Sequence, residues 1–226
     1  MRKLHWTAGV TASLAMIIIL LISSFQAAMY LDFGVYQKEY EKYDVLSELD
    51  MTMDDVMEVT EEMMAYLKGD RPELSVITTV EGKEQDFFNE QDRFHMEEVQ
   101  GLFIGGLHLR RNALIVLILC IGFLLAVKAD LWKILSRSYQ IVLGILAALL
   151  AILGIAMARD FTKVFTIFHE IFFDNDLWIF DPATDYMIRM LPEGLFFDMV
   201  LRIGLYFVLG LLVMLVLSII ARRKLR

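Results

Sequence analysis

The sequence predicts a mainly α-helical membrane protein, with four transmembrane helices and an extracytoplasmic α/β cap that contains a β-hairpin. Of its 226 residues, 58% are hydrophobic, and the mean hydropathy is +0.56, which excludes a soluble single domain. Of four apolar runs, those near residues 8–29, 141–158 and 203–221 approach the roughly 20 residues that a helix needs to cross the hydrocarbon. The run near 113–127 is shorter and must extend back through Arg110 and Arg111, whose side-chain stems can snorkel. Polar, aromatic-rich segments separate the first run from the second and the third from the fourth, and these segments predict the cap.

Basic residues beside the apolar runs predict the orientation. They lie before the first run, between the second and third, and after the fourth, and such an excess marks the cytoplasmic side. Arg110 and Arg111, beside the second run, oppose this orientation but are outnumbered. Both termini of this multi-pass plasma-membrane protein are therefore expected in the cytoplasm. The basic residues are Arg2, Lys3, Lys128, Lys133, Arg137, Arg222, Arg223, Lys224 and Arg226.

The runs and the charges divide the chain into segments. The first run is longer than a typical signal-peptide core, so an uncleaved anchor is expected there. In chain order the expected segments are the N-terminus and first span (1–29), the extracytoplasmic cap with helices and a hairpin (30–107), the second span (108–128), a cytoplasmic loop (129–138), the third span (139–158), an extracytoplasmic aromatic-rich segment (159–200), the fourth span (201–221) and a cytoplasmic basic tail (222–226).

Charge and cysteine content restrict the partners and the bonds of the cap. The formal net charge is −8, and the first long connection is acid-rich, which argues against nucleic acid as a partner. The single cysteine, Cys120, falls in the second span. It allows no intramolecular disulfide and is expected to be a small buried hydrophobe.

Local patterns predict the first elements of the cap. The tyrosine-rich residues 30–43 are expected to continue the first helix into the membrane interface. Thr52, with Asp55 three residues later, starts a helix over 53–67. Gly69 ends that helix.

Two further elements lead to the second span. A β-rich stretch favours a hairpin with its turn near Gly82. Asn89 caps a helix that runs towards the second span, and His95 shares one face of that helix with apolar residues. Glu97 and Glu98 fall elsewhere or at the edge of this face.

Aromatic rings are concentrated between the third and fourth apolar runs. They recur at helical spacing, so that His169 has Phe165 one turn behind it and Phe172 and Phe173 one turn ahead. The pattern fits an interfacial site around an imidazole, or an amphipathic helix that rests in the headgroup region. The predicted topology puts His95 and His169 on the same side of the bilayer, where we expect them to be close.

The chemistry open to these two histidines is limited by the rest of the sequence. A pair of partly buried, hydrogen-bonded imidazoles would explain them without catalysis. Zinc accepts His and Glu ligands, but H-E-x-x-H does not occur and Glu170 directly follows His169, so no metal or other cofactor is expected. G-x-S-x-G, phosphate-loop and dinucleotide motifs do not occur either. An enzyme of this composition would use histidine acid–base chemistry without an acyl-enzyme.

Three segments carry a family resemblance: RFHMEEVQGLF (93–103), FHEIFFDNDLW (168–178) and DPATDYMIRMLPEGLFFD (181–198). They are similar to signature segments of the bacterial lipoprotein intramolecular transacylases, whose layout of four spans with a large first and a shorter second outer loop is similar too. The resemblance covers essentially the full chain. It implies an acyltransferase of Gram-positive bacteria that acts on diacylglyceryl lipoproteins. Such enzymes move the sn-2 acyl chain from the glyceryl group to the α-amino group of the lipoprotein's own N-terminal cysteine, which leaves a lyso-form lipoprotein.

The resemblance also implies the site. Its two histidines match His95 and His169, one as base on the amine and the other as stabiliser of the oxyanion or proton donor to the leaving oxygen. The implied partners are diacylglyceryl lipoproteins and membrane lipid. Packing would also explain the remaining aromatic residues, helix termination would explain Asn175 and Asp176, and a surface role would explain Arg93. The substrate-binding residues expected are Phe165, Phe172, Phe173, Trp178, Asn175, Asp176 and Arg93, the last holding either Asp176 or a lipid phosphate.

Two other functions stay open at this stage. One is a non-enzymatic membrane protein that binds a partner through its acidic outer loop. The other is a membrane metallohydrolase.

Overall fold

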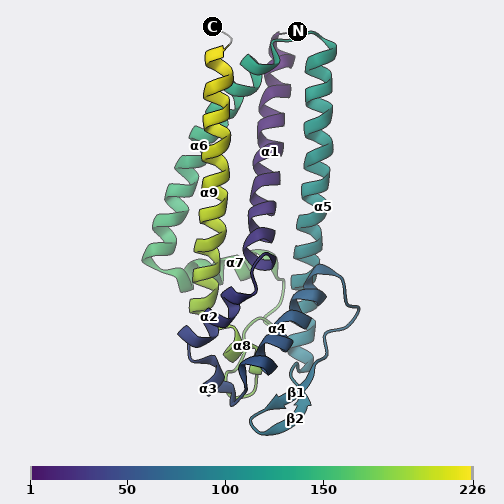
Figure 1. Ribbon diagram of the computed structural model, residues 1–226, viewed down its shortest axis with the longest axis vertical. Coiled ribbons are helices and arrows are strands. Elements are labelled where there is room, and N and C mark those ends of the chain that lie inside the picture. The colour runs from purple at the N-terminus through teal and green to yellow at the C-terminus, as the bar shows by residue number, and fades with distance from the viewer. Residues whose placement is uncertain (1, 225–226) are drawn as a thin grey trace. The chain divides into compact units, whose positions relative to one another are not determined.

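The computed structural model describes residues 2–224, so Met1, Leu225 and Arg226, and with them the end of the predicted basic tail, lie outside the described residues. Two compact units result. The membrane unit comprises Met1–Ala28, Leu107–Asp160 and Leu201–Arg226, and the inter-span unit comprises Met29–Gly106 and Phe161–Val200. The elements (Figure 1) are α1 (Arg2–Tyr30), α2 (Gly34–Lys42), α3 (Val45–Leu49), α4 (Met53–Lys68), β1 (Ile77–Val80), β2 (Lys83–Asp86), α5 (Glu90–Ala126), α6 (Leu131–Arg159), α7 (Phe161–Phe172), α8 (Tyr186–Met190) and α9 (Glu193–Lys224).

The membrane unit is built from α1, α6, α9 and the second half of α5. These four helices are long and apolar enough to cross a membrane, and together with the two-stranded sheet they confirm the predicted fold class. Helices α1, α6 and α9 lie side by side (Figure 1) around a small buried cluster. Within it the Tyr139 hydroxyl donates to the Leu211 carbonyl at 2.7 Å, which pairs a polar group that hydrocarbon would leave unsatisfied. The cluster consists of Ile17, Tyr139, Val142, Phe207 and Leu211.

Two details of the membrane unit differ from the expectations. Helix α6 begins at Leu131, so most of the expected loop 129–138 is helical, because the Asp130 carboxylate accepts a hydrogen bond from the Lys133 amide at 3.2 Å and caps the helix. Cys120 is partly exposed rather than buried, because little of the apolar part of α5 is covered by other helices.

The chain does not continue α1 through residues 30–43 as expected. Helix α1 ends at Tyr30 and α2 starts at Gly34. Between them the Asp32 carboxylate accepts a hydrogen bond from the Gly34 amide at 3.0 Å, a local side-chain bond that competes with helix.

Two predictions for the inter-span unit are confirmed. The Thr52 hydroxyl accepts the Asp55 amide at 3.2 Å at the start of α4, and Gly69 ends that helix with φ +86°. Strands β1 and β2 form an antiparallel hairpin. Its two turn residues, Glu81 and Gly82, have φ of +52° and +71°, the left-handed conformation of a tight hairpin turn.

Helix α5 links the two units in sequence. The Asn89 side chain accepts the Asp92 amide and the Asp92 carboxylate accepts the Asn89 amide, both at 2.9 Å, which confirms the predicted cap. The helix has 37 residues and is thus about 55 Å long, well beyond the roughly 30 Å of hydrocarbon. His95, in its second turn, belongs to the inter-span unit and lies outside the spanning part.

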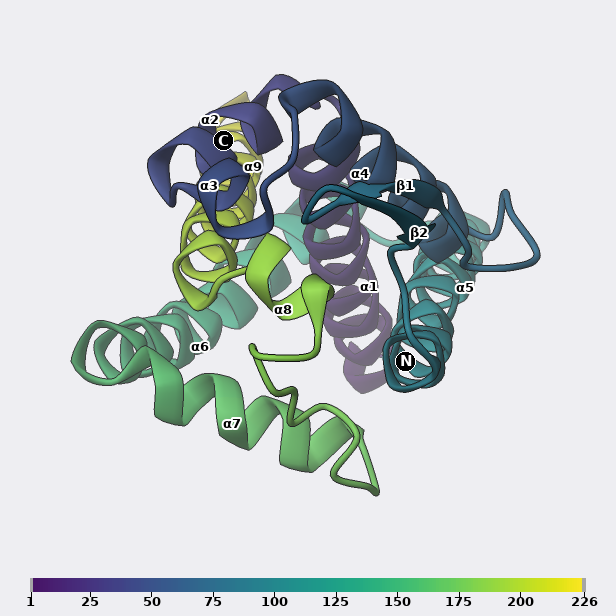
Figure 2. The same cartoon turned by 90° about the horizontal axis from the view of Figure 1, so that it is seen from below.

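Helix α7 and the chain after it complete the inter-span unit. Beyond Phe172 the chain doubles back beside α7 before it enters α8 (Figure 2). Buried tyrosine, phenylalanine and methionine side chains from the helices and the hairpin form the core, among them Tyr36, Tyr40, Met64, Phe87, Phe88 and Met190.

Candidate active site

The two histidines of the aromatic segments lie together in the inter-span unit. The ring centroids of His95 and His169 are 6.1 Å apart and the ring planes are inclined by 24°. Only 6% of His95 and 7% of His169 is exposed. The expectation that α5 and α7 bring two imidazoles close to each other is therefore correct.

His169 is held by one hydrogen bond and by aromatic rings, of which Phe165 and Trp178 are the nearest. Its Nδ1 lies 2.7 Å from the Phe165 carbonyl oxygen. A carbonyl only accepts, so the neutral ring carries its proton on Nδ1 and leaves Nε2 as a proton acceptor. The Phe165 ring meets the imidazole edge-on at 4.3 Å, and the Trp178 ring stacks on it at 4.8 Å.

His95 has an apolar surrounding and an unpaired nitrogen. The Phe173 ring lies 4.9 Å and the Phe180 ring 5.4 Å from its centroid. Its Nδ1 is buried, with no hydrogen-bond partner in the described structure. Sequence reasoning did not assign Phe180 to the site, because this ring follows an irregular loop and falls outside the helical repeat of α7.

Burial sets the charge of both rings. Desolvation, together with the neighbouring His169, lowers the pKa of His95 to about 4. Desolvation also lowers the pKa of His169, and the hydrogen bond to Phe165 opposes part of this effect. Both imidazoles are therefore neutral at physiological pH and can exchange protons there.

The predicted rings differ in their relation to the pair. Phe173 is buried and contacts both histidines, at 4.9 Å and 5.5 Å. Phe172 is 52% exposed and its ring lies 4.7 Å from that of Phe168. Within residues 2–224 no ring contact between Phe172 and either histidine is described. Helix α7 ends at Phe172, and it is Phe173, the first residue beyond the helix, whose ring is buried.

The predicted polar residues have partners that the sequence did not indicate. The Arg93 guanidinium pairs with Asp86 at 2.6 Å and donates to the Leu74 carbonyl at 2.9 Å, so it ties α5 to the hairpin rather than to Asp176. The Asn175 amide nitrogen donates to the Glu98 carboxylate at 2.9 Å. Glu98, expected at the edge of the His95 face or away from it, thus turns towards the loop that follows α7.

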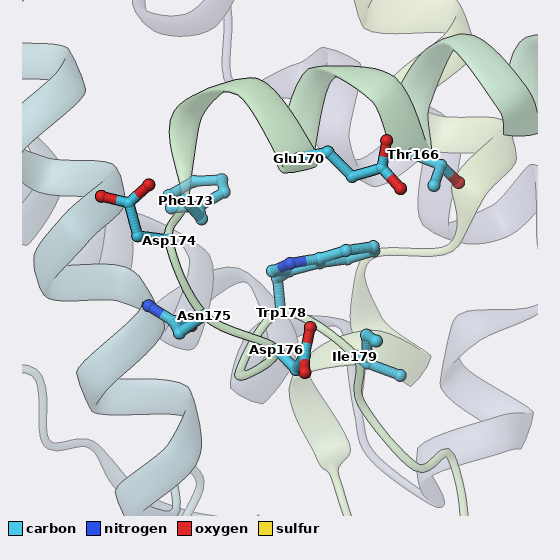
Figure 3. Close-up of a pocket in the computed structure, with 8 residues that line it drawn as sticks. All are labelled: Thr166, Glu170, Phe173, Asp174, Asn175, Asp176, Trp178 and Ile179. Atoms are coloured by element: carbon cyan, nitrogen blue, oxygen red, sulfur yellow. The ribbon is translucent and has the colours of Figure 1, made fainter.

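An open pocket of about 500 Å³ adjoins the pair through Phe173 and Trp178. In Figure 3 the Trp178 ring lies beneath the part of α7 that carries Thr166 and Glu170, and the Asn175 side chain points towards α5. The two histidines do not line this pocket, but Trp178, which does, stacks on His169. The lining residues are Thr166, Glu170, Phe173, Asp174, Asn175, Asp176, Trp178 and Ile179.

Metal ligands do not gather at the pair. Among the described residues, no group of three or more His, Cys, Asp and Glu side chains is placed to hold a metal ion.

Comparison with known families and structures gives one consistent result. The family model described as "Lipoprotein intramolecular transacylase Lit" matches residues 10–197. A comparison with curated protein sequences gave no match.

Solved structures of a membrane-integral lipoprotein intramolecular transacylase from Bacillus cereus have the same fold. One superimposes with a TM-score of 0.77 at 21% identity, over 99% of this chain and 98% of that one. A variant of the same protein with one histidine replaced by alanine gives a TM-score of 0.73 at 20% identity, over 98% and 95% of the two chains. A variant with arginine as the replacement also gives 0.73 at 20% identity, over 98% and 93%.

Proposed function

The chain belongs to the lipoprotein intramolecular transacylases and is an integral membrane acyltransferase, and from this premise we propose that it moves an acyl chain within a single lipoprotein molecule. The substrate is a diacylglyceryl lipoprotein, with its lipid on the N-terminal cysteine. The sn-2 acyl chain passes from the glyceryl oxygen to the α-amino nitrogen of that cysteine. The observation that carries this proposal is the pair of buried, neutral imidazoles 6.1 Å apart.

The reaction forms one bond and breaks one. The α-amine attacks the sn-2 ester carbonyl, so that a C–N bond forms and a tetrahedral adduct carries a negative oxygen. The adduct collapses as the C–O bond to the glyceryl group breaks. The amine loses one proton and the departing sn-2 oxygen gains one, so no water and no acyl-enzyme are required.

The geometry supports one division of the proton transfers between the two histidines. His169 has a free acceptor at Nε2, because Nδ1 donates to the Phe165 carbonyl, and this suits the base that takes the amine proton. His95, whose Nδ1 has no protein partner in the described structure, can donate a hydrogen bond to the oxyanion, and the imidazolium that His169 becomes then gives its proton to the leaving oxygen. Both reacting groups belong to one molecule. Holding them in place therefore lowers the activation free energy by several kcal/mol, which is equivalent to a high effective concentration of one group at the other.

The aromatic rings support the same reaction. Phe173 contacts both imidazoles, and Trp178 and Phe165 enclose His169. Such a surrounding excludes water, which strengthens hydrogen bonds to the developing charge and suppresses hydrolysis of the ester.

The test is mass spectrometry of a lipoprotein N-terminal peptide from a host that lacks its own enzyme. Expression of this protein should move one acyl chain from glycerol to nitrogen at unchanged total mass. His95→Ala and His169→Ala should each lower the rate by about 10²- to 10⁴-fold. His108→Ala removes an exposed histidine from the same α5 helix and should leave the rate unchanged.

Two outcomes would overturn the proposal. If both histidine variants kept full lyso-lipoprotein formation, the pair would not be catalytic. If a strong chelator abolished the activity of the native protein, a metal-dependent reaction would replace the acid–base scheme.

We place the site on the extracytoplasmic face, with both termini in the cytoplasm. The excess of Lys and Arg beside the termini and in the α5–α6 connection supports this orientation. In a Cys120→Ala background, Glu84→Cys on the exposed strand β2 should react with an impermeant maleimide in intact cells. Labelling only after permeabilisation would reverse the orientation.

A further inference from the structure

The side chain of Glu98 presents a second unpaired polar atom next to the histidine pair. Glu98 follows His95 by three positions on α5, so their side chains are neighbours on one helix face, with β-carbons about 5–6 Å apart. The Glu98 Oε1 atom accepts the Asn175 amide at 2.9 Å. The Oε2 atom is buried, with no hydrogen-bond partner in the described structure.

Asn175 holds this carboxylate by a hydrogen bond from the loop that follows α7. Its own side-chain oxygen accepts the Leu177 amide at 2.9 Å, which holds the Asn175 amide group in one orientation. It lies two residues after Phe173, whose ring contacts both imidazoles. The loop after α7 therefore positions both an aromatic wall of the pair and the clamp on Glu98.

A buried carboxylate oxygen without a donor costs free energy until a ligand supplies one. The two imidazoles are neutral and offer Glu98 no compensating charge. Arg93, two residues before His95 on the same helix, pairs with Asp86. Within the described residues no ion pair of Glu98 is found, so the ligand that fits is cationic and rich in N–H donors.

We infer that Glu98 binds the α-amino group of the lipoprotein through Oε2, and that Asn175 is the positioning residue that aims it. This inference rests on the proposed function, in which a primary amine must approach an ester next to His95. The two residues that carry these unpaired atoms are three positions apart on α5, and the two atoms suit the two halves of the reaction. Glu98 receives the nitrogen nucleophile and His95 receives the carbonyl oxygen.

The contact with Glu98 would bind the substrate more tightly than the product. A free α-amine has a pKa near 8, so it carries a proton much of the time and offers up to three donors to a carboxylate. The product is an amide with one N–H and no charge. Glu98 thus favours the substrate and lets the N-acylated lipoprotein leave.

The experiment compares two unreactive probes that differ only at nitrogen. Both are cysteinyl peptides with an ether-linked dialkylglyceryl group, which cannot transfer an acyl chain, and one has a free α-amine while the other is N-acetylated. Binding is measured by titration calorimetry on the full-length protein in detergent. The native protein should bind the free amine about 10- to 100-fold more tightly, as expected for one hydrogen bond to a charged group.

Glu98→Gln should lose most of this preference while it still binds the N-acetylated probe. Glu97→Gln, a neighbouring carboxylate on the exposed face of α5, should keep it. Asn175→Ala keeps the carboxylate but removes the hydrogen bond that positions it, and it should lose part of the preference for the free amine. This variant provides the test if Glu98→Gln does not fold. An unchanged preference in the folded variants, or no preference in the native protein, overturns the inference.

These results separate the inference from the function on which it rests. If the native protein forms lyso-lipoprotein while Glu98→Gln keeps the full preference for the free amine, only the role of Glu98 is wrong. If the native protein forms no lyso-lipoprotein, the proposed function fails whatever the probes show.

Discussion

Asp92→Asn removes a buried charge one helix turn before His95 and should change how stability depends on pH. Asp92 is 0% exposed. Its Oδ2 atom accepts the Asn89 amide, and its Oδ1 atom is buried without a partner in the described structure. Burial, and then the nearby Asp185 carboxylate, raise the pKa of Asp92 to about 6. Asparagine keeps the capping acceptor, carries no charge and can place an amide donor where the unpaired oxygen lies.

The size of the effect follows from that pKa. The difference between it and the ordinary aspartate value, about 3.9, corresponds to about 3 kcal/mol in full, and we expect about 1–3 kcal/mol after screening by solvent. Between about pH 4 and about pH 6 the folded state binds more protons than the unfolded state, so the stability of the native protein falls as pH rises through this window. Asp92→Asn lacks this loss. Its free energy of unfolding, relative to that of the native protein, should therefore rise by about 1–3 kcal/mol from about pH 4.5 to about pH 7.5.

The assay is thermal unfolding in detergent across this pH range. For a chain of this size 1 kcal/mol corresponds to about 2–4 °C. The two site histidines are present in both proteins, so their own titration cancels in the difference. Glu97→Gln, which removes an exposed carboxylate from the same helix, should show no such trend. A difference between Asp92→Asn and the native protein that stays constant with pH, or shrinks as pH rises, would refute the reasoning.

Three further predictions concern activity and packing. Because burial keeps both site histidines neutral, with a pKa of about 4 for His95, kcat/KM should rise with pH as the substrate amine near pKa 8 deprotonates, and a fall centred near the ordinary histidine pKa of about 6.5 would contradict this. Gly194→Ala places a methyl group against the Tyr43 ring and should lower stability by about 1–3 kcal/mol in thermal unfolding, whereas Gly101→Ala faces open space and should not. Trp178→Ala removes the ring stacked on the imidazole and should lower kcat/KM by about 2- to 10-fold, the worth of one aromatic contact, while Trp178→Phe retains more activity; equal losses in both would argue against stacking.

The sequence predicted those parts of the site that depend on one helix at a time. The spacing of Phe165 and His169 on α7, and the face that His95 occupies on α5, follow from the helical repeat alone. Proximity of the two histidines required only the membrane topology in addition. The helical features involve residues within one or two turns, where geometry is fixed by the backbone.

The contacts that were not predicted join segments far apart in the sequence. Trp178 stacks on His169 because an irregular loop doubles back beside α7. The path of such a loop cannot be predicted from the helical or strand periodicity of the sequence. Arg93 was expected near Asp176 or lipid, but Asp86 at the end of the hairpin holds it. Glu98 lies where the helical repeat put it, yet its partner Asn175 comes from a loop 77 positions away. For a residue at the edge of a helix face, such as Glu98, only the folded structure shows which neighbouring segment its side chain contacts.

The lowered pKa of the histidines suits both proton transfers of the proposed reaction, the removal of a proton from the attacking amine and the donation of a proton to the departing sn-2 oxygen. Burial lowers the pKa of His169, the proposed base, and a base weakened in this way would not readily deprotonate a free ammonium group. The proton it must take, however, belongs to an amine that has already attacked the carbonyl, and this nitrogen is far more acidic than the free amine. The resulting imidazolium is a stronger acid than one in water, so it readily protonates the departing sn-2 oxygen. Burial therefore lowers the basicity that the first step does not need and raises the acidity on which the second step depends.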